Sequence, residues 1–349
     1  MTRVLLTGAA GFIGSHILSA LSPTFDVVAI DAMLASAHGT ENRPDGIDRV
    51  DVRDHDALVT LLENTDVVCH QAAVVGAGVD AADAPAYASH NDFGTAVLLS
   101  AMAEAGCRRL VLASSMVVYG EGKYCNPSGH VVTPGPRTEL GVGQFDNTDP
   151  DTGEVLDWAP VTEDSALRPR STYAASKVAQ ENYALAWTLA TGGSVTALRY
   201  HNVYGPHMPR NTPYSGVAAM FRSSLEAGQP PQVYEDGKQL RDFVHVSDIA
   251  AANALSISAD LPGFTALNVS SGQPITIGEV AQTLSDACDG PAPEITGKYR
   301  SGDVRHIVAS PELAREKIGF SAAIPPDVGL CEFATAPLRD AEGTGAPRV

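Results

Sequence analysis

The fold is decided near the start of the chain, where residues Arg3 to Leu21 read RVLLTGAAGFIGSHILSAL. An apolar run of strand length enters a loop with Gly8, Gly11 and Gly14, and apolar residues with helical spacing follow from Phe12 onward. Glycine tolerates positive φ and lets the backbone approach a pyrophosphate, whose charge then lies at the N-terminus of the helix. The G-x-x-G-x-x-G spacing between a strand and a helix therefore predicts a dinucleotide-binding loop.

A second strand-like run, Asp26 to Ile30, is followed at once by Asp31. A carboxylate at the end of the second strand of such a unit can accept hydrogen bonds from both hydroxyls of an adenosine ribose, and it repels a 2′-phosphate. Asp31 therefore favours NAD over NADP as the cofactor.

The pattern of strand, loop and helix repeats along the first 200 residues. Further strands are predicted at Asp66–Cys69, Arg109–Ala113 and Val195–Arg199, and further helices at Ala96–Ala105 and Thr172–Ala190. This alternation predicts an α/β fold with a doubly wound parallel sheet, a Rossmann domain over residues 1–200. The segment from Gly120 to Pro169 is rich in Pro, Gly, Asp and Thr, so we expect a long insertion or lid there.

The second half of the chain is less regular, and it predicts a smaller C-terminal α/β lobe over residues 201–339 that mainly binds substrate. Its predicted elements are helices at Val217–Ala227, Val246–Ser258 and Ile277–Ala287 and a strand at Gln232–Tyr234. Residues 340–349 are expected to be a disordered tail.

The composition excludes several classes of protein. The chain has 349 residues and a formal net charge of −18, with 23 Lys and Arg against 41 Asp and Glu. This acidity argues against nucleic-acid binding, and an anionic substrate would need a local cationic pocket. No apolar run approaches the roughly 20 residues that cross a membrane, and the N-terminus lacks the layout of a signal peptide. We therefore expect a cytoplasmic protein without membrane contact.

Neither disulfides nor a metal site are predicted. The five cysteines include no C-x-x-C pair and are expected to be reduced thiols: Cys69, Cys107, Cys125, Cys288 and Cys331. The insertion contains a set of possible ligands, Cys125, His130, Asp149 and Asp151. Their spacing matches no zinc pattern, and oxidation of a hydroxyl by NAD requires no metal.

Three residues are predicted to be catalytic. Tyr173 and Lys177 form the pattern Y-x-x-x-K at the start of a predicted helix, so both side chains lie on one face, a turn apart. A phenol is a poor base at neutral pH, but a neighbouring ammonium and a positive nicotinamide both favour the phenolate. Ser115, at the end of a predicted strand, supplies a hydroxyl that can hold a substrate oxygen beside the phenol.

A series of motifs gives the chain a family resemblance over roughly residues 2 to 320. They are TGAAGFIGSH at 7–16, Asp51-Val52, HQAA at 70–73, Asn91 with Gly94-Thr95, SSMVVYG at 114–120, YAASK at 173–177, RYHNVYGP at 199–206 and RDFVHV at 241–246. Together they resemble the NAD-dependent epimerase/dehydratase family of the extended short-chain dehydrogenases/reductases. The resemblance implies a Rossmann fold, bound NAD and a nucleotide-sugar substrate.

The resemblance also implies which residues bind each ligand. The residues expected to contact NAD are Gly8, Gly11, Phe12, Ile13, Gly14, Asp31, Asp51, Val52, Ala72, Ala73, His90, Tyr173, Lys177 and His201. Those expected to contact the nucleotide-diphosphate sugar are Ser115, Tyr173, Asn202, Arg241 and Arg300. The two arginines could clamp the diphosphate. Family members commonly form homodimers, so we expect the helices carrying Val97–Met102 and Tyr173–Ala190 to pair with a second copy.

The reaction is indicated by the residues that follow Ser115. Sugar dehydratases of this family usually carry an Asp-Glu pair there, whereas this chain has Met116 and Val117, which cannot act as acid or base. The resemblance therefore implies a 4-epimerase for a dTDP- or UDP-hexose. In such an enzyme, hydride passes to bound NAD and returns to the opposite face of the 4-keto sugar.

Two alternatives would use the same residues. A nucleotide-4-keto-sugar reductase or dehydrogenase would need exchangeable NAD(P), and an NAD-binding redox sensor would need no turnover, which the retained catalytic residues disfavour. The runs PYSGVAA at 213–219 and YEDG at 234–237 resemble the subgroup that includes dTDP-rhamnose 4-epimerases. The base and the sugar remain open from sequence.

Overall fold

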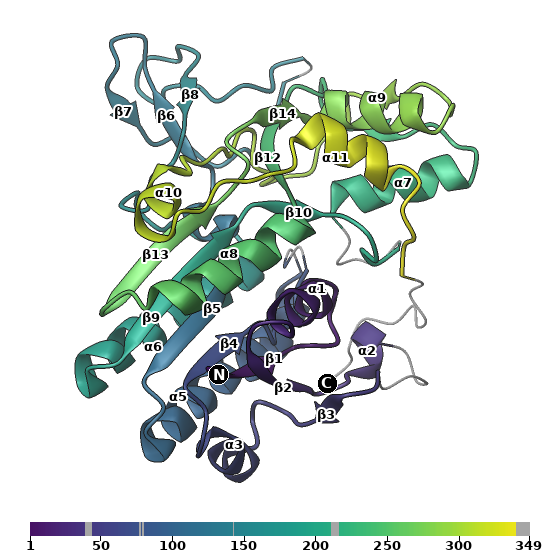
Figure 1. Cartoon of the computed structure of the whole chain (residues 1–349). Helices are drawn as coiled ribbons and strands as arrows, with labels where there is room; N and C mark the ends of the chain where they lie inside the picture. The colour runs from purple at the N-terminus through teal and green to yellow at the C-terminus, as the bar shows by residue number, and fades with distance from the viewer. Residues whose placement is uncertain (39–43, 77, 79, 142, 211–215, 340–349) are drawn as a thin grey trace.

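A seven-stranded parallel sheet forms the centre of the molecule, in the order β13-β9-β5-β4-β1-β2-β3 (Figure 1). The computed structural model describes residues 1–38, 44–76, 78, 80–141, 143–210 and 216–339. The strands are β1 (Arg3–Thr7), β2 (Asp26–Asp31), β3 (Ile47–Arg49), β4 (Val67–His70), β5 (Arg109–Ser115), β9 (Ser194–Tyr200) and β13 (Phe264–Val269). The predicted tail at 340–349 and residues 213–215 of the PYSGVAA run lie outside the described residues.

Helices cover both faces of this sheet, because alternate side chains of each strand point to opposite faces. Val4 and Leu6 of β1 belong to the apolar cluster with α1 (Phe12–Leu21), α8 (Val246–Ala259) and α10 (Glu312–Ile318). Leu5 belongs to the cluster with α3 (His55–Leu62), α5 (Gly94–Ala105) and α6 (Thr172–Thr191). The predicted doubly wound Rossmann fold is confirmed.

The order of the strands in the sheet indicates where a ligand is expected to bind. β1 and β4 are neighbours in the sheet, although β2 and β3 separate them in the sequence. Open parallel sheets bind ligands beyond the carboxyl ends of their strands, at the point where the strand order reverses. The glycine loop after β1 and the segments after β4 and β5 therefore lie at the edge where a dinucleotide is expected.

The segment from Gly120 to Pro169 folds as an insertion with a small antiparallel sheet of its own. Its strands are β6 (Lys123–Cys125), β7 (Val131–Val132) and β8 (Asp157–Ala159), with β6 in the middle. Ion pairs join the insertion to the second lobe, since Arg137 lies 2.8 Å from Glu235 and Arg305 lies 2.8 Å from Asp146. The insertion is thus fixed to the second lobe.

The second lobe packs three helices against a three-stranded sheet, at the upper right of Figure 1. Its elements are β10 (Asn202–Tyr204), α7 (Val217–Glu226), β12 (Leu240–His245), β14 (Pro274–Thr276), α9 (Ile277–Ala287) and α11 (Pro326–Phe333), with a further pair of strands, β11 (Gln232–Val233) and β15 (Glu294–Ile295). The division of the chain at residue 200 stays a prediction. Two elements beyond it, α8 and β13, belong to the large sheet and its helical cover.

Several short elements carry no sequence pattern that predicts them. They are α2 (Ala35–His38), α4 (Ala84–Tyr87), 3-10 turns at Ala81–Asp83 and Met116–Tyr119, and a π-helical turn at Ala88–Phe93. Helices this short do not complete an amphipathic repeat, so apolar spacing cannot mark them.

Three further observations concern the chain as a whole. Within the described ranges, no helix is long and apolar enough to cross a membrane. The same ranges hold no group of three or more His, Cys, Asp or Glu placed to bind a metal ion. All five cysteines are free thiols.

Candidate active site

The glycine loop between β1 and α1 has the geometry of a phosphate-binding turn. Gly8 has a φ of +69°, and a Cβ placed there would lie 2.6 Å from the backbone nitrogen of Ala72. A Cβ on Gly14 would overlap the carbonyl oxygen of Gly8. Gly11 caps α1 without a side-chain hydrogen bond, so no capping side chain competes with a ligand for the N–H groups of the first turn. The loop therefore fits the pyrophosphate of a dinucleotide.

Asp31 lies buried at the end of β2, beside this loop. Its carboxylate accepts hydrogen bonds from the N–H groups of Ala10 at 3.1 Å and Met33 at 2.8 Å, and Nε2 of His38 lies 3.3 Å away. Burial raises the pKa of Asp31, but hydrogen bonds from His38 and the backbone outweigh it and hold the pKa below its ordinary value. The carboxylate is therefore charged at neutral pH, as an acceptor for ribose hydroxyls must be.

Ser115 and Tyr173 meet from two different elements. Ser115 ends β5, and Tyr173 lies in the first turn of α6, where the N-cap Ser171 accepts a hydrogen bond from the N–H of Ala174 at 3.1 Å. The Ser115 side chain lies near enough to the Tyr173 phenol to favour a lower pKa for that phenol. The ring of Tyr87 packs against that of Tyr173, with centroids 5.6 Å apart. The structure therefore brings two of the three predicted catalytic residues together.

Lys177 completes the group one turn further along α6. Its Nζ lies 5.9 Å from the centroid of the Tyr173 ring and donates to the carbonyl oxygen of Ala113 at 2.9 Å. Burial lowers the pKa of Lys177 to about 8, against the opposing negative charges of Glu181 and Asp92. The side chain is thus mostly an ammonium at pH 7 and supplies a positive charge beside the phenol ring.

The expected lowering of the Tyr173 pKa is not found in the protein chain by itself. Burial of the phenol, followed by the neighbouring Tyr87, raises the pKa of Tyr173, and the nearby Ser115 side chain offsets this only in part. The physical reason is that the Lys177 ammonium bonds to Ala113 rather than to the phenol oxygen. In the protein chain by itself, Tyr173 therefore stays a neutral phenol at pH 7.

A buried ion pair behind these residues ties three elements together. Arg199 of β9 donates to both carboxylate oxygens of Glu181 on α6, at 3.0 and 2.7 Å, and neither side chain is more than 4% exposed. Glu181 also accepts a hydrogen bond from Ser114, the neighbour of Ser115 on β5. Arg199 donates further to the hydroxyl of Tyr119 at 2.8 Å. The pair thereby links the elements that carry all three predicted catalytic residues, a role that the sequence pattern does not reveal.

Asn91 is a second positioning residue. It lies in the π-helical turn, where its side-chain amide accepts from the N–H of Val74 at 2.8 Å and donates to the carbonyl of Val74 at 2.9 Å and to Ser176 Oγ at 3.0 Å. It thus joins the segment after β4 to α6. π-helical turns are frequent at functional sites, and the sequence signal for this residue is its place before Gly94-Thr95.

Most other residues predicted to contact the cofactor lie at the same edge of the sheet. They are Phe12 and Ile13 at the start of α1, Val52 in the segment after β3, Ala72 and Ala73 after β4, and His90 in the π-helical turn. The N–H of Ala72 is fixed by a hydrogen bond to Thr7 Oγ1 at 3.2 Å. Burial, together with the charge of Arg53, lowers the pKa of His90, which is therefore neutral at pH 7.

Asp51 and His201, two further residues predicted to contact NAD, have different surroundings. Asp51 forms an ion pair with Arg53 at 2.6 Å, and both line a shallow surface pocket. His201 is buried, and neither of its ring nitrogens has a partner among the described residues. Burial, with the charge of Arg241, lowers the pKa of His201 to about 3, so the ring is neutral. Buried unpaired ring nitrogens fit a hydrogen-bonding ligand at this place.

Asn202 and Arg241 lie on the paired strands β10 and β12. The Oδ1 atom of Asn202 is buried and has no hydrogen-bond partner within the described part of the chain. A buried acceptor without a partner fits a ligand that donates a hydrogen bond to it. The guanidinium of Arg241 is half-buried and donates to the carbonyl oxygens of Val304 at 2.6 Å and Arg305 at 3.0 Å. Part of its donor capacity is therefore used within the chain.

Arg300 is the more exposed of the two arginines predicted to clamp a diphosphate. It lies 3.2 Å from Asp303 and stacks over the ring of Tyr234 at 5.5 Å. The charge of Asp303 also acts on Arg241, so both guanidiniums lie close to this one carboxylate. The structure thus brings the two arginines to one region, and their contact with the substrate stays a prediction.

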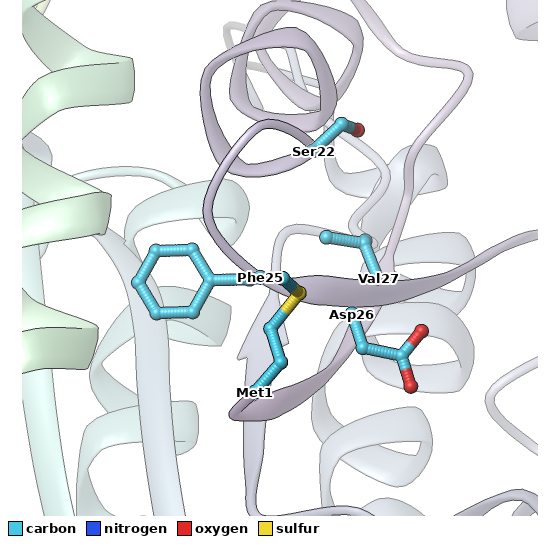
Figure 2. A pocket seen from close by; sticks show the side chains of 5 residues that line it. All are labelled: Met1, Ser22, Phe25, Asp26 and Val27. Atoms are coloured by element: carbon cyan, nitrogen blue, oxygen red, sulfur yellow. The ribbon is translucent and has the colours of Figure 1, made fainter.

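A surface pocket elsewhere is separate from this site. Figure 2 shows that it lies around the amino end of β2 and is lined by Met1, Ser22, Phe25, Asp26 and Val27. The predicted catalytic group lies instead at the carboxyl ends of the parallel strands. Because the lining includes a single carboxylate and no base beside it, we assign no chemistry to this pocket.

The fold, the glycine loop and the Ser-Tyr-Lys group define a class of NAD-binding enzymes. Residues 4–140 and 149–269 match the NAD dependent epimerase/dehydratase family, and the chain belongs to this family. The predicted family membership is confirmed, and with it NAD as the cofactor.

Among its relatives, the chain is 31% identical over 346 residues to the dTDP-L-rhamnose 4-epimerase of Burkholderia thailandensis, a match that covers 95% of this chain and 94% of that protein. Among solved structures, it is 31% identical to the UDP-glucose 4-epimerase of Thermus thermophilus in complex with NAD, with a TM-score of 0.75 over 95% of this chain and 98% of that one. The UDP-N-acetylglucosamine 4-epimerase of Methanobrevibacter ruminantium, in complex with UDP-N-acetylmuramic acid, is 30% identical, with a TM-score of 0.77 over 95% and 97% of the two chains.

Proposed function

We propose that the chain is a nucleotide-sugar 4-epimerase that works with tightly held NAD, and that dTDP-L-rhamnose is the first substrate to test. The observation that carries the proposal is the placement of Ser115, Tyr173 and Lys177 at the same sheet edge as the glycine loop. The relative from Burkholderia thailandensis supports the sugar, and the similar UDP-sugar 4-epimerases support the reaction.

Each of the three residues has a defined role in this proposal. Tyr173 removes the proton from the C4 hydroxyl of the sugar and returns it after epimerisation. Ser115, which lies near Tyr173, holds the same oxygen in place. Lys177 keeps a positive charge beside the phenol ring and binds the nicotinamide ribose. Bound NAD supplies the reversible oxidation at C4.

Met116 and Val117 support epimerisation over dehydration. Met116 packs against an apolar cluster that includes Val161 and Ile307, and neither Met116 nor Val117 can transfer a proton. Loss of water from a sugar needs an acid and a base beside the leaving hydroxyl and the adjacent carbon. We therefore expect no 6-deoxy-4-keto sugar to form from the hexoses of a substrate panel that carry a 6-hydroxyl group.

A substrate panel without added cofactor tests the proposal. The purified protein is incubated with dTDP- and UDP-hexoses, and NMR measures the ratio of the two 4-epimers. Interconversion is expected without added NAD, fastest for dTDP-L-rhamnose. A reductase would instead consume added NADH or NADPH with the sugar, and a redox sensor would turn over no sugar; either outcome would overturn the proposal.

Asp31→Ala is expected to narrow the preference for NAD over NADP. The charged carboxylate repels a 2′-phosphate, so we expect wild-type protein to bind NADP at least about tenfold more weakly than NAD, and the variant to bind both with affinities within about threefold. Calorimetric titration measures the two dissociation constants. Asp56→Ala, a change of an exposed acid on α3, is the control. Tighter binding of NADP than of NAD by the wild type would contradict the role of Asp31.

We also propose a homodimer built from α5 and α6, which pack against each other. Tyr183, Leu185 and Leu189 of α6 are exposed, and so is Phe93 immediately before α5. Exposed apolar side chains on helices that pack together are typical of an interface.

Leu189→Glu is expected to convert this dimer into a monomer, because it places a charge where an apolar side chain is 82% exposed in the single chain. Light scattering at micromolar concentration measures the mass. Leu255→Glu, on the distant helix α8, is the matched control and is expected to leave the dimer intact. A monomeric wild-type protein at this concentration would rule the interface out.

For the location, we propose the cytoplasm. The support for it is the state of the five cysteines, which are all free thiols. Free thiols persist in a reducing compartment, whereas secreted proteins usually pair them.

A further inference from the structure

The last described residues return to the cofactor side of the molecule. After α11 the chain turns away from the second lobe and runs toward the level of α1 (Figure 1). We call residues 335–339 the C-terminal segment. The N–H of His207 donates to the carbonyl of Pro337 at 2.7 Å, and the N–H of Arg339 donates to the carbonyl of Met208 at 3.1 Å. The C-terminal segment is thereby fixed against the loop that follows β10.

Arg339 of the C-terminal segment contacts the glycine loop directly. Its Nη1 donates to the carbonyl oxygen of Ala10 at 2.9 Å. The N–H of the same Ala10 donates to the carboxylate of Asp31 at 3.1 Å. One loop residue thus bonds both to the guanidinium and to the carboxylate that is placed for the adenosine ribose, and the charge of Asp31 acts on Arg339.

The guanidinium has unused hydrogen-bonding capacity. Its bond to Ala10 is the one that it makes with the described residues, which leaves Nε and Nη2 for a ligand. Burial lowers the pKa of Arg339, with the charge of Asp31 opposing, and a guanidinium stays protonated at any physiological pH. A half-buried cation with donors to spare, bound to a loop shaped for phosphate, is suited to a phosphate oxygen.

We propose that Arg339 is a cofactor-binding residue that donates to the diphosphate of the ADP half of NAD. The diphosphate is expected at the N-terminus of α1, and the ribose at Asp31, so a guanidinium attached to Ala10 adjoins both places. Because the C-terminal segment is continuous with the second lobe, this contact also ties the substrate side to the cofactor. The contact helps to retain NAD between the removal of hydride from C4 and its return. This part of the inference rests on the proposed epimerase function.

Displacement of bound NAD from the purified holoenzyme separates a phosphate contact from a structural role. ADP and adenosine are titrated as competitors, and the ratio of their displacing concentrations reports how much the phosphates contribute. Arg339→Gln keeps an N–H donor for Ala10 but removes the charge, whereas Arg339→Lys keeps the charge but loses the planar fork. Arg315→Gln, an exposed arginine on α10, is the matched control.

We expect Arg339→Gln to reduce the advantage of ADP over adenosine by about 10- to 100-fold, and to speed the exchange of bound NAD for labelled NAD by a similar factor. Arg339→Lys is expected to lie between this variant and the wild type, and Arg315→Gln to match the wild type. An unchanged ratio in both Arg339 variants would overturn the proposal. Equal weakening of ADP and adenosine would also overturn it, because Arg339 would then only shape the loop. Neither readout depends on sugar turnover, so failure here is distinguishable from failure of the epimerase proposal.

Discussion

Tyr173→Phe is expected to lower kcat by roughly 10³-fold while leaving the affinity for NAD nearly unchanged. The substitution removes only the phenol oxygen, which lies near Ser115, and the ring can still pack against Tyr87. Proton transfer at the C4 hydroxyl then has no acceptor within reach. Initial rates with the best sugar of the panel, and the NAD content of the purified variant, measure the two effects.

Tyr183→Phe is the matched control, because Tyr183 lies on the same helix, α6, and is exposed. Its kcat is expected to stay within about twofold of the wild type. If Tyr173→Phe retained activity within about tenfold of the wild type, Tyr173 could not be the base.

Arg199→Ala is expected to reduce the free energy of unfolding by about 3–5 kcal/mol. Arg199 donates to both carboxylate oxygens of Glu181, and neither side chain is more than 4% exposed, so its loss leaves a buried carboxylate without its counter-charge. We also expect lower activity, because the same pair holds α6 beside β5. Denaturant unfolding followed by circular dichroism measures the stability.

Two further variants separate the burial of charge from other effects. Arg315→Ala breaks an ion pair with Glu312 in which both side chains are more than half exposed, and it is expected to cost below about 1 kcal/mol. The double variant Arg199→Met with Glu181→Leu removes both buried charges and is expected to regain part of the loss. If the Arg199→Ala protein were as stable as the Arg315→Ala protein, the Arg199–Glu181 pair could not be what stabilises the site.

The fold could be predicted where the signal is local. The strand before Gly8 and the helix after it are adjacent in the chain, so their apolar spacing and the glycine loop mark the Rossmann unit directly. The strand Phe264–Val269 shows the limit of such reasoning. Its short run FTALNV carries no clear alternation, and it becomes the edge of the sheet only through pairing with β9, far earlier in the sequence.

In the candidate site, the sequence pattern points to candidate catalytic residues but not to the buried contacts behind them. Tyr173 and Lys177 stand in one short motif, whereas the Glu181 carboxylate meets Ser114, which is 67 residues away in the chain. No local pattern shows which buried charges will meet. The Tyr173 pKa likewise follows from burial and from the neighbouring ring of Tyr87, which packing alone decides.

The contact between Arg339 and Ala10 is the most distant of these, because the partners are 329 positions apart in the chain. Arg339 stands in no motif, and the residues before it carry no repeating pattern. Its place beside the glycine loop follows from the pairing of the C-terminal segment with the loop after β10.

The central claim is that hydrogen leaves C4 of the sugar and returns to the same carbon within one enzyme molecule. A nucleotide sugar deuterated at C4 tests it most directly, with mass spectrometry and NMR of both epimers at equilibrium. The epimerase proposal predicts that deuterium remains at C4 of both epimers, because carbon-bound hydride does not exchange with water, and that no added NAD or NADH is needed. Loss of the label to solvent, or turnover that consumes added NADH or NAD in proportion to product, would contradict it and would favour the oxidoreductase alternative with the same three catalytic residues.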